Sequence, residues 1–269
     1  MKLTISNIAW TAEADDAVLS LLGQSKIAGV EIAPTRVFPD WQWTPDRVAA
    51  YQTLLGQHGL VCSSLQAIVY GKPDLKLFGT PAEKAALVAH LKRVADLAVE
   101  LGARPLVFGA PKNRDRGDLD DRAAVAQAVD VFAEVGDYCA ERGVCLCIEP
   151  NPPVYACNFV TNSQQGAELV RAVNSPGFRL HLDAAGMHLA GEDIPRALEA
   201  AADVLAHVHI SEPNLGTFAA PQVDHRGMAA GLRSIGWDQW LSIEMRATDP
   251  AIDSVKQAIQ TVLDLYDVV

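Results

Sequence analysis

Four short stretches in the second half of the chain decide its fold: VCLCIE (144–149), FRLHLD (178–183), LAHVH (205–209) and WLSIE (240–244). Each is an apolar run that is bounded by turn residues and followed by a helix-like segment, which is typical of a buried parallel strand. Each run also ends in a carboxylate or an imidazole, and such a group is costly to bury unless it faces a site. In a (β/α)8 barrel, the carboxyl ends of all strands meet at the end that carries the active site. The four runs therefore predict a common site at one end of a barrel.

Strand-like and helix-like segments alternate along the whole chain. Amphipathic helices are predicted over 81–101, 118–142, 163–173 and 252–266, and the strand-like runs end near Trp10, Glu31, Ile68, Pro111, Pro150, Asp183, Ser211 and Met245. Thr44 and Pro45 form a typical helix start, and Gly59, Gly102 and Gly143 follow predicted helices. A doubly wound sheet would usually carry a glycine-rich loop after its first strand, and residues 7–13 contain no glycine. We therefore predict an α/β fold, a (β/α)8 (TIM) barrel, with residues 1–269 forming a single domain.

Composition narrows the class of partner. The net charge of -11 argues against a broad nucleic-acid or acidic-membrane surface, so a small-molecule partner is expected. The N-terminus lacks the apolar core of a signal peptide and no apolar stretch is long enough to span a membrane, so we expect a cytoplasmic protein. The five cysteines show no paired CxxC spacing, and Cys145 and Cys147 are expected to be buried as small apolar side chains.

The four strand-end residues have the composition of a metal site. Glu149, Asp183, His209 and Glu244 supply hard oxygen donors and one imidazole, the set preferred by Mn2+ or Mg2+, whereas zinc usually takes more nitrogen or sulfur. A single glutamate at a strand end is often only an ion-pair partner. Four such residues, one βα unit apart and each at the end of its run, favour a metal site. We expect one divalent ion, with Mn2+ as the first choice and Mg2+, Co2+ or Zn2+ as alternatives.

Several motifs resemble a known family. The segments 148–150 (IEP), 182–183 (LD), 207–211 (HVHIS), 242–245 (SIEM) and 29–32 (GVEI) are similar to the xylose isomerase-like barrel superfamily, and within it to the sugar phosphate isomerase/epimerase group that includes the ketose 3-epimerases. The resemblance implies that one divalent ion is held by Glu149, Asp183, His209 and Glu244. It also implies that Glu149 and Glu244 transfer the proton, and that dimers or tetramers of the chain form.

The chemistry of such a site is general. A metal that chelates a carbonyl oxygen and a neighbouring hydroxyl stabilises an enediolate and acidifies the C–H between them. Two carboxylates on opposite faces then remove and return the proton with inversion. Return to the adjacent carbon gives aldose–ketose isomerisation, and loss of a β-hydroxyl gives dehydration. We predict a metal-dependent isomerase or epimerase of a sugar, sugar acid or sugar phosphate, with a dehydratase or lyase of a cyclic polyol or keto acid as the alternative.

The chain departs from the ketose 3-epimerases at substrate-binding positions. Those enzymes have a second glutamate six residues after the strand-five ligand and an arginine six after the histidine ligand. Tyr155 and Leu215 occupy these places here. The substrate-binding histidine of the epimerases lies three residues beyond the aspartate, whereas His188 lies five beyond Asp183. The metal ligands are kept while the residues expected around the substrate differ.

Polar residues near strand ends are candidates for substrate contacts. Lys112 and Arg114 either bind a carboxylate or phosphate or belong to a solvated charged loop. His188 either contacts substrate or is an ordinary loop histidine, and His207 is expected to face the helices. Glu31 either orients substrate or bridges strands, and Asp224 with His225 is a candidate helix N-cap. Further candidates for binding hydroxyl groups are Gln66, Asn151, Glu212 and Arg246.

Other classes of function fit less well. The apurinic endonucleases of the same superfamily use three metals held by many histidines, whereas His58 and His90 lie in helix-like segments here and the chain is acidic. A non-catalytic sugar-binding barrel is possible in principle, because a fold does not guarantee activity. The chain has no nucleophile elbow of a serine or cysteine hydrolase.

Overall fold

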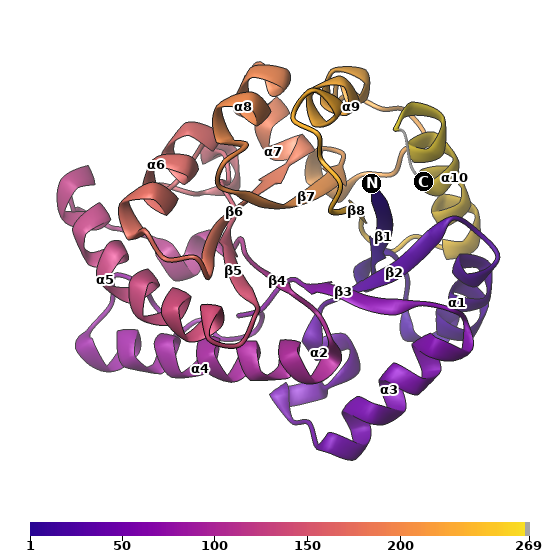
Figure 1. Cartoon of the computed structure of the whole chain (residues 1–269), viewed down its shortest axis with the longest axis horizontal. Helices are drawn as coiled ribbons and strands as arrows, with labels where there is room; N and C mark the ends of the chain where they lie inside the picture. The colour runs from indigo at the N-terminus through magenta and orange to yellow at the C-terminus, as the bar shows by residue number, and fades with distance from the viewer. Residues whose placement is uncertain (267–269) are drawn as a thin grey trace.

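The computed structural model describes residues 1–266 and contains a closed barrel of parallel strands in the order β1 to β8, with β8 pairing back to β1 (Figure 1). The predicted (β/α)8 architecture is therefore confirmed. The strands are β1 (Lys2–Ser6), β2 (Ile27–Ile32), β3 (Val61–Leu65), β4 (Pro105–Phe108), β5 (Cys145–Ile148), β6 (Phe178–Asp183), β7 (Leu205–Ser211) and β8 (Trp240–Glu244).

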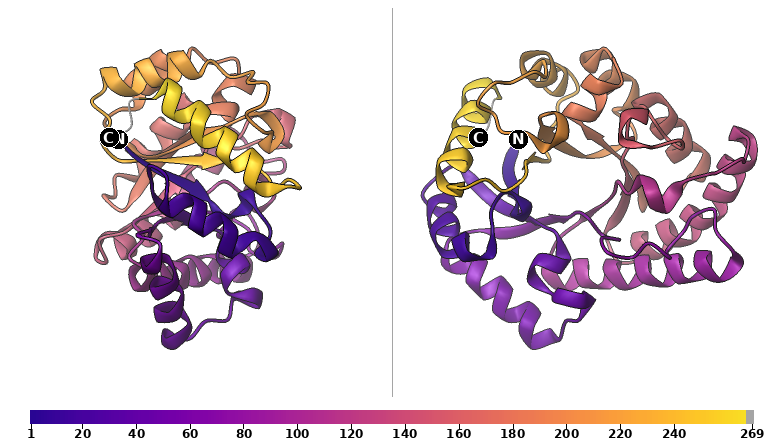
Figure 2. Two further views of the ribbon diagram at one scale, coloured as in Figure 1. Left: turned by 90° about the vertical axis from the view of Figure 1, so that its right-hand side faces the viewer. Right: turned by 180° about the vertical axis from the view of Figure 1, so that it is seen from behind.

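Helices surround the strands as an outer ring (Figures 1 and 2). One long helix follows each strand: α1 (Asp15–Gly23), α3 (Pro45–Gln57), α4 (Pro81–Leu101), α5 (Asp121–Ala140), α6 (Ser163–Val173), α8 (Ile194–Ala201), α9 (His225–Ser234) and α10 (Ala251–Leu265). Two shorter helices, α2 (Pro34–Val37) and α7 (Ala184–Leu189), lie directly after β2 and β6. Within the described residues, no helix is long and apolar enough to cross a membrane.

Local capping signals explain where the helices begin and end. The side chain of Thr44 accepts a hydrogen bond from the backbone of Arg47 at the start of α3, as its sequence predicted. Thr80 and Glu83 form a reciprocal capping box at the start of α4. Gly59, Gly102 and Gly143 have φ values of 71°, 77° and 72°, the left-handed conformation expected after a helix.

Three strands end earlier than their apolar patterns predicted. β1 ends at Ser6, β3 at Leu65 and β4 at Phe108, each three or four residues before the expected end. After β1, the chain enters a 3-10 turn over Asn7–Ala9, and the Ser6 hydroxyl accepts from the backbone of Ile8. After β3, Ile68 and Val69 are buried although they lie in a loop. The apolar run therefore continues past the end of the strand, because loop residues after it are also buried. For this reason its length overestimates the length of the strand.

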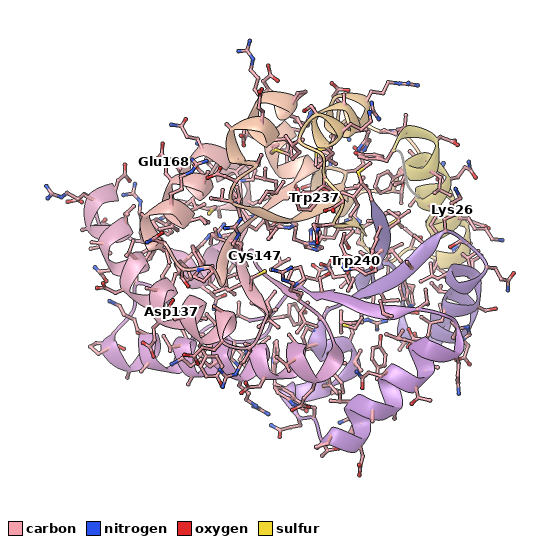
Figure 3. All side chains as sticks on the ribbon, in the orientation of Figure 1. Lys26, Asp137, Cys147, Glu168, Trp237 and Trp240 are labelled. Carbon is pink, nitrogen blue, oxygen red and sulfur yellow. The ribbon has the colours of Figure 1, made fainter. Side chains whose placement is uncertain are left out.

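The apolar core lies mainly between the strands and the helices. Phe132 of α5 stacks on Phe178 of β6 with ring centroids 4.5 Å apart, and Phe108 of β4 meets Phe132 edge-on. All five cysteines are buried and free, including Cys145 and Cys147 on β5. Figure 3 shows Lys26, Asp137 and Glu168 on the outer elements, with Cys147 and Trp240 on barrel strands.

The strand register aligns the polar ends of the later strands. Asp183 on β6 pairs with His209 on β7, and Ser211 on β7 pairs with Glu244 on β8. Because parallel strands share one direction, all these side chains reach the same end of the barrel. This end carries the candidate site.

Candidate active site

A cavity of about 780 Å³ opens at the carboxyl end of the barrel. Its size is within the range of small-molecule sites, roughly 300–1,000 Å³. Segments that follow β3, β4, β5 and β7 form its walls, and Glu149, Asp183 and Glu244 lie together in its lining. Residues of the loops after β3, β4 and β5, within 70–79, 111–118 and 151–162, contribute to it.

Three of the four predicted metal ligands form a compact group. One ligand atom from each of Asp183, His209 and Glu244 lies within 4.8 Å of the other two. Glu149 reaches the same cavity from β5 and interacts electrostatically with Asp183 and Glu244. The folded chain therefore brings together all four residues that the strand-end pattern singled out.

Asp183 is held on both of its carboxylate oxygens. The backbone N–H of Gly186 donates to Oδ1 at 2.6 Å, and the Ser211 hydroxyl donates to Oδ2. Ser211 in turn accepts from the backbone of Ala185 at 3.1 Å. Asp183 thus caps α7 while it faces the cavity, which fixes the direction of its side chain.

His209 lies between two carboxylates. Its Nε2 is 2.8 Å from Oε1 of Glu31, and its Nδ1 is 3.3 Å from Oε2 of Glu244. Burial opposes a charge on the ring, but the attraction of Glu31 and Glu244 prevails and holds the pKa of His209 well above its usual value. Both ring nitrogens are buried, and neither makes a hydrogen bond of good geometry to a described residue, so each meets its carboxylate as an ion-pair partner.

The carboxylates of the cavity repel one another. Burial, with the charges of Asp183 and Glu244, raises the pKa of Glu149 to about 8. Burial and Glu244 likewise raise the pKa of Asp183 to about 6. The opposing positive charges are His209 and Arg114, both of which favour ionised Glu149. Two strongly perturbed carboxyl groups in a cleft are typical of a functional site.

These features fit a divalent cation. Three carboxylates and one imidazole provide the hard donor set that Mn2+ and related ions prefer. The mutual repulsion of the carboxylates is unfavourable unless a positive charge is bound among them. Glu149, Asp183, His209 and Glu244 are therefore the residues that would hold the ion.

Gly109, directly after β4, leaves the space that the Glu149 carboxylate occupies. The sequence patterns did not single out this glycine. A Cβ added to Gly109 would lie 1.8 Å from Oε2 of Glu149. The carboxylate occupies the space that a side chain at position 109 would fill. A glycine near the end of a predicted strand was the available signal, and glycines at strand ends commonly have other causes.

The predicted substrate contacts separate into two groups. Gln66, Lys112, Asn151 and Glu212 line the cavity. Arg114 is fully buried outside the lining and donates to the Phe108 carbonyl at 3.3 Å and to Sγ of Cys157 at 3.5 Å. His188 and Arg246 are exposed and also lie outside the lining.

The expectation that His207 faces the helices was wrong. Its Nε2 is hydrogen-bonded to Oε2 of Glu31 at 2.7 Å inside the barrel, and its side chain is fully buried. Side chains alternate along a strand with a period of two, so residues 207 and 209 share one face. Glu31 is also fully buried and does not line the cavity, so it bridges strands.

Two hydrogen-bonded connections shape the cavity wall after β7. Glu212 is buried and accepts from the backbone of Gln222 at 2.8 Å, and it pairs with Nε2 of His225 at 2.7 Å. His225 follows Asp224, which caps α9 as predicted. The Tyr155 hydroxyl accepts from the backbone of Asn214 at 2.9 Å, so the two positions that depart from the ketose 3-epimerases, 155 and 215, lie close together across the mouth.

We predict that Gly109→Ala reduces the affinity for a divalent ion by about tenfold or more, because the new methyl group must displace the Glu149 carboxylate. The stability of the barrel should change little, because the end of a flexible side chain gives way. Titration calorimetry with Mn2+ measures the first effect and thermal melting the second. Gly56→Ala is the matched control, since nothing lies within 4 Å of its added Cβ in α3. Unchanged affinity in Gly109→Ala would contradict this role of Gly109.

We also predict that the metal-free protein loses stability as the pH rises from about 7 to about 8.5. The raised pKa of Glu149 means that the native state binds more protons than the unfolded state, so the free energy of unfolding falls as the pH passes through about 8. Histidines of the unfolded chain are already neutral in this window. Urea unfolding in the presence of a chelator measures the effect, and Glu149→Gln should weaken the dependence. An equal slope in the variant would count against the assignment to Glu149.

Comparisons with known proteins agree with this geometry. An L-ribulose 3-epimerase of Mesorhizobium japonicum is 25% identical over 119 residues, which is 44% of this chain and 40% of the relative's length. A structure of D-psicose 3-epimerase with D-tagatose from Clostridium cellulolyticum H10 superposes with a TM-score of 0.81 at 16% identity, over 98% of this chain and 97% of that one. A structure of IolI protein with a bound zinc atom superposes with a TM-score of 0.79 at 20% identity, over 98% of each chain.

At these identities the solved structures establish a common fold. The match to the family itself extends over nearly the whole barrel, from residue 20 to residue 265. It therefore covers all four strand-end residues as well as the loops that form the cavity. The chain belongs to the xylose isomerase-like TIM barrel family.

Proposed function

We propose that this chain is a divalent-metal-dependent isomerase or epimerase acting on a sugar or a close derivative of one. The observation that carries the proposal is that two glutamates, Glu149 and Glu244, lie in one cavity with Asp183, and that Nδ1 of His209 lies 3.3 Å from Oε2 of Glu244. A cavity with only a structural ion pair would not need three carboxylates in one lining, with the pKa of both Glu149 and Asp183 raised.

Two of the four residues only bind the ion, and the other two also transfer the proton. When bound, a divalent ion acidifies the C–H between a carbonyl and a hydroxyl group that it chelates. Asp183 and His209 act as fixed ligands, because the first is held by Ser211 and Gly186 and the second by Glu31. Glu149 and Glu244, on β5 and β8, remove and return the proton.

The comparisons support a carbohydrate as the substrate. Structures similar to this chain include epimerases bound to D-tagatose, D-fructose and D-allulose. The cavity wall differs here, since Tyr155 and Leu215 occupy positions that carry a glutamate and an arginine in the ketose 3-epimerases. Lys112, exposed at the rim, is a candidate contact for a carboxylate or phosphate. We therefore propose a sugar acid or sugar phosphate ahead of a free ketohexose, and Mn2+ as the ion.

Replacing either glutamate should stop proton transfer. We expect Glu149→Gln and Glu244→Gln each to lower kcat by about 10³-fold, because the amide cannot accept the proton. Proton NMR in D2O detects exchange of the substrate C–H for deuterium whichever carbon reacts, and a panel of ketoses, their phosphates and sugar acids supplies the substrate. Glu168→Gln, an exposed position on α6, is the matched control. Full exchange activity in either site variant would refute the proton-transfer assignment.

Removing the metal should also abolish the exchange. We expect a chelator to eliminate activity and Mn2+ to restore it, because the ion would hold the carbonyl and hydroxyl oxygens and acidify the C–H between them. Mass spectrometry of the product separates the two chemistries that the site permits: isomerisation and epimerisation keep the mass, whereas dehydration lowers it by one water. Activity that is indifferent to the chelator would refute the metal-dependent mechanism.

A further inference from the structure

Glu31 on β2 is a carboxylate buried inside the barrel, beneath the cavity rather than in its wall. Oε2 accepts hydrogen bonds from the Ser64 hydroxyl and pairs with Nε2 of His207, both at 2.7 Å. Oε1 accepts from the Ser242 hydroxyl at 2.9 Å and lies 2.8 Å from Nε2 of His209. Each oxygen thus has two partners. Burying an ionised carboxylate is costly, so it stays ionised at this depth only because both of its oxygens have such partners.

The lower end of the barrel keeps solvent away from this carboxylate. Gly29 precedes Glu31 by two residues and so shares its face of β2. A Cβ added at Gly29 would lie 3.3 Å from Cη2 of Trp240, which places that indole below Glu31 in the barrel interior. Neither substrate nor solvent reaches Glu31 from the described cavity, so a direct contact with substrate is excluded as its role.

Three partners of Glu31, namely Ser64, Ser242 and His207, do not line the cavity. The fourth partner is His209, which is a predicted metal ligand. His209 turns Nε2 toward Glu31, and this orientation directs Nδ1 toward Glu244 and Asp183. The ring of His181 packs edge-on against the ring of His209 with centroids 4.1 Å apart. A carboxylate therefore lies at each ring nitrogen: Glu31, outside the cavity lining, at Nε2, and Glu244, itself a predicted metal ligand, at Nδ1. Nδ1 is thus the nitrogen on the side of the predicted ion.

We propose that Glu31 is the positioning residue for the metal site: it binds Nε2 of His209 and thereby presents Nδ1 to the divalent ion. Metal-ligating histidines commonly carry such a carboxylate on the far nitrogen, which fixes the ring and makes it a better ligand. Ser64, Ser242 and His207 hold Glu31 itself in place, since they occupy its other hydrogen-bonding sites. This inference rests on the proposed metal site and assigns to β2 a part in it.

The test compares Mn2+ binding in the wild-type chain and in Glu31→Gln. Glutamine keeps the shape of the side chain but places a donor where a carboxylate oxygen accepts. Titration followed by the electron paramagnetic resonance signal of free Mn2+ should show affinity about 10–100-fold weaker in the variant. Glu199→Gln, at an exposed position on α8, is the matched control and should bind as the wild type does. Circular dichroism and thermal melting of the metal-free proteins report separately on folding.

The outcomes distinguish this inference from the proposed function. Wild-type protein that binds no divalent ion overturns the metal site and the role of Glu31 with it. Wild-type binding that is matched by a folded Glu31→Gln overturns the role of Glu31 alone. If the variant does not fold, nitrogen-15 NMR of the wild-type protein with Zn2+ decides. Binding through Nδ1 of His209 with a proton on Nε2 is expected, and binding through Nε2 overturns the inference.

Discussion

The candidate site is dominated by the repulsion among three carboxylates that the barrel brings to one end. Glu149, Asp183 and Glu244 lie at or directly after the ends of three separate strands, and the closed sheet brings all three into one cavity. Burial and mutual charge raise the pKa of two of them, and His209 with Arg114 offsets only part of this negative charge. Such a cluster is costly for a protein on its own and favourable around a cation. The same charges that repel one another are the ones that would bind the metal.

Beneath that cluster, the interior of the barrel is polar. Barrel interiors of this type are usually filled by branched apolar side chains. Here the interior near Glu31 contains hydroxyls and imidazoles, and the fully buried members include Thr4, Ser64, His181, His207 and Ser242. The apolar contacts that stabilise the fold lie instead between the strands and the helices, as in the stacking of Phe132 on Phe178. This division leaves the inside of the barrel free to orient the site.

The strand-end pattern singled out four residues that meet at the cavity because that signal is local. Each of Glu149, Asp183, His209 and Glu244 follows an apolar run of its own strand, and the fold then aligns the strands. Predictions for the loops were less complete. Arg114 was expected near substrate or in solvent, yet its guanidinium is buried against Phe108 and Cys157. His188 and Arg246 lie outside the cavity lining, because a position just past a strand does not fix the direction of a side chain.

By itself, the sequence determined the barrel, the helix caps and the identity of the strand-end residues. Periodicity, glycines after helices and the position of a polar residue after an apolar run are all properties of neighbouring residues. Only the tertiary structure decided which groups meet: Glu31 and His207 pair across 176 positions in the chain, and Glu149 occupies the space left by Gly109. Such contacts depend on strand register and on closure of the sheet. These bring distant segments together in a way that no local sequence pattern encodes. The four strand-end residues therefore indicate the chemistry, and the packing beneath and around them sets its geometry.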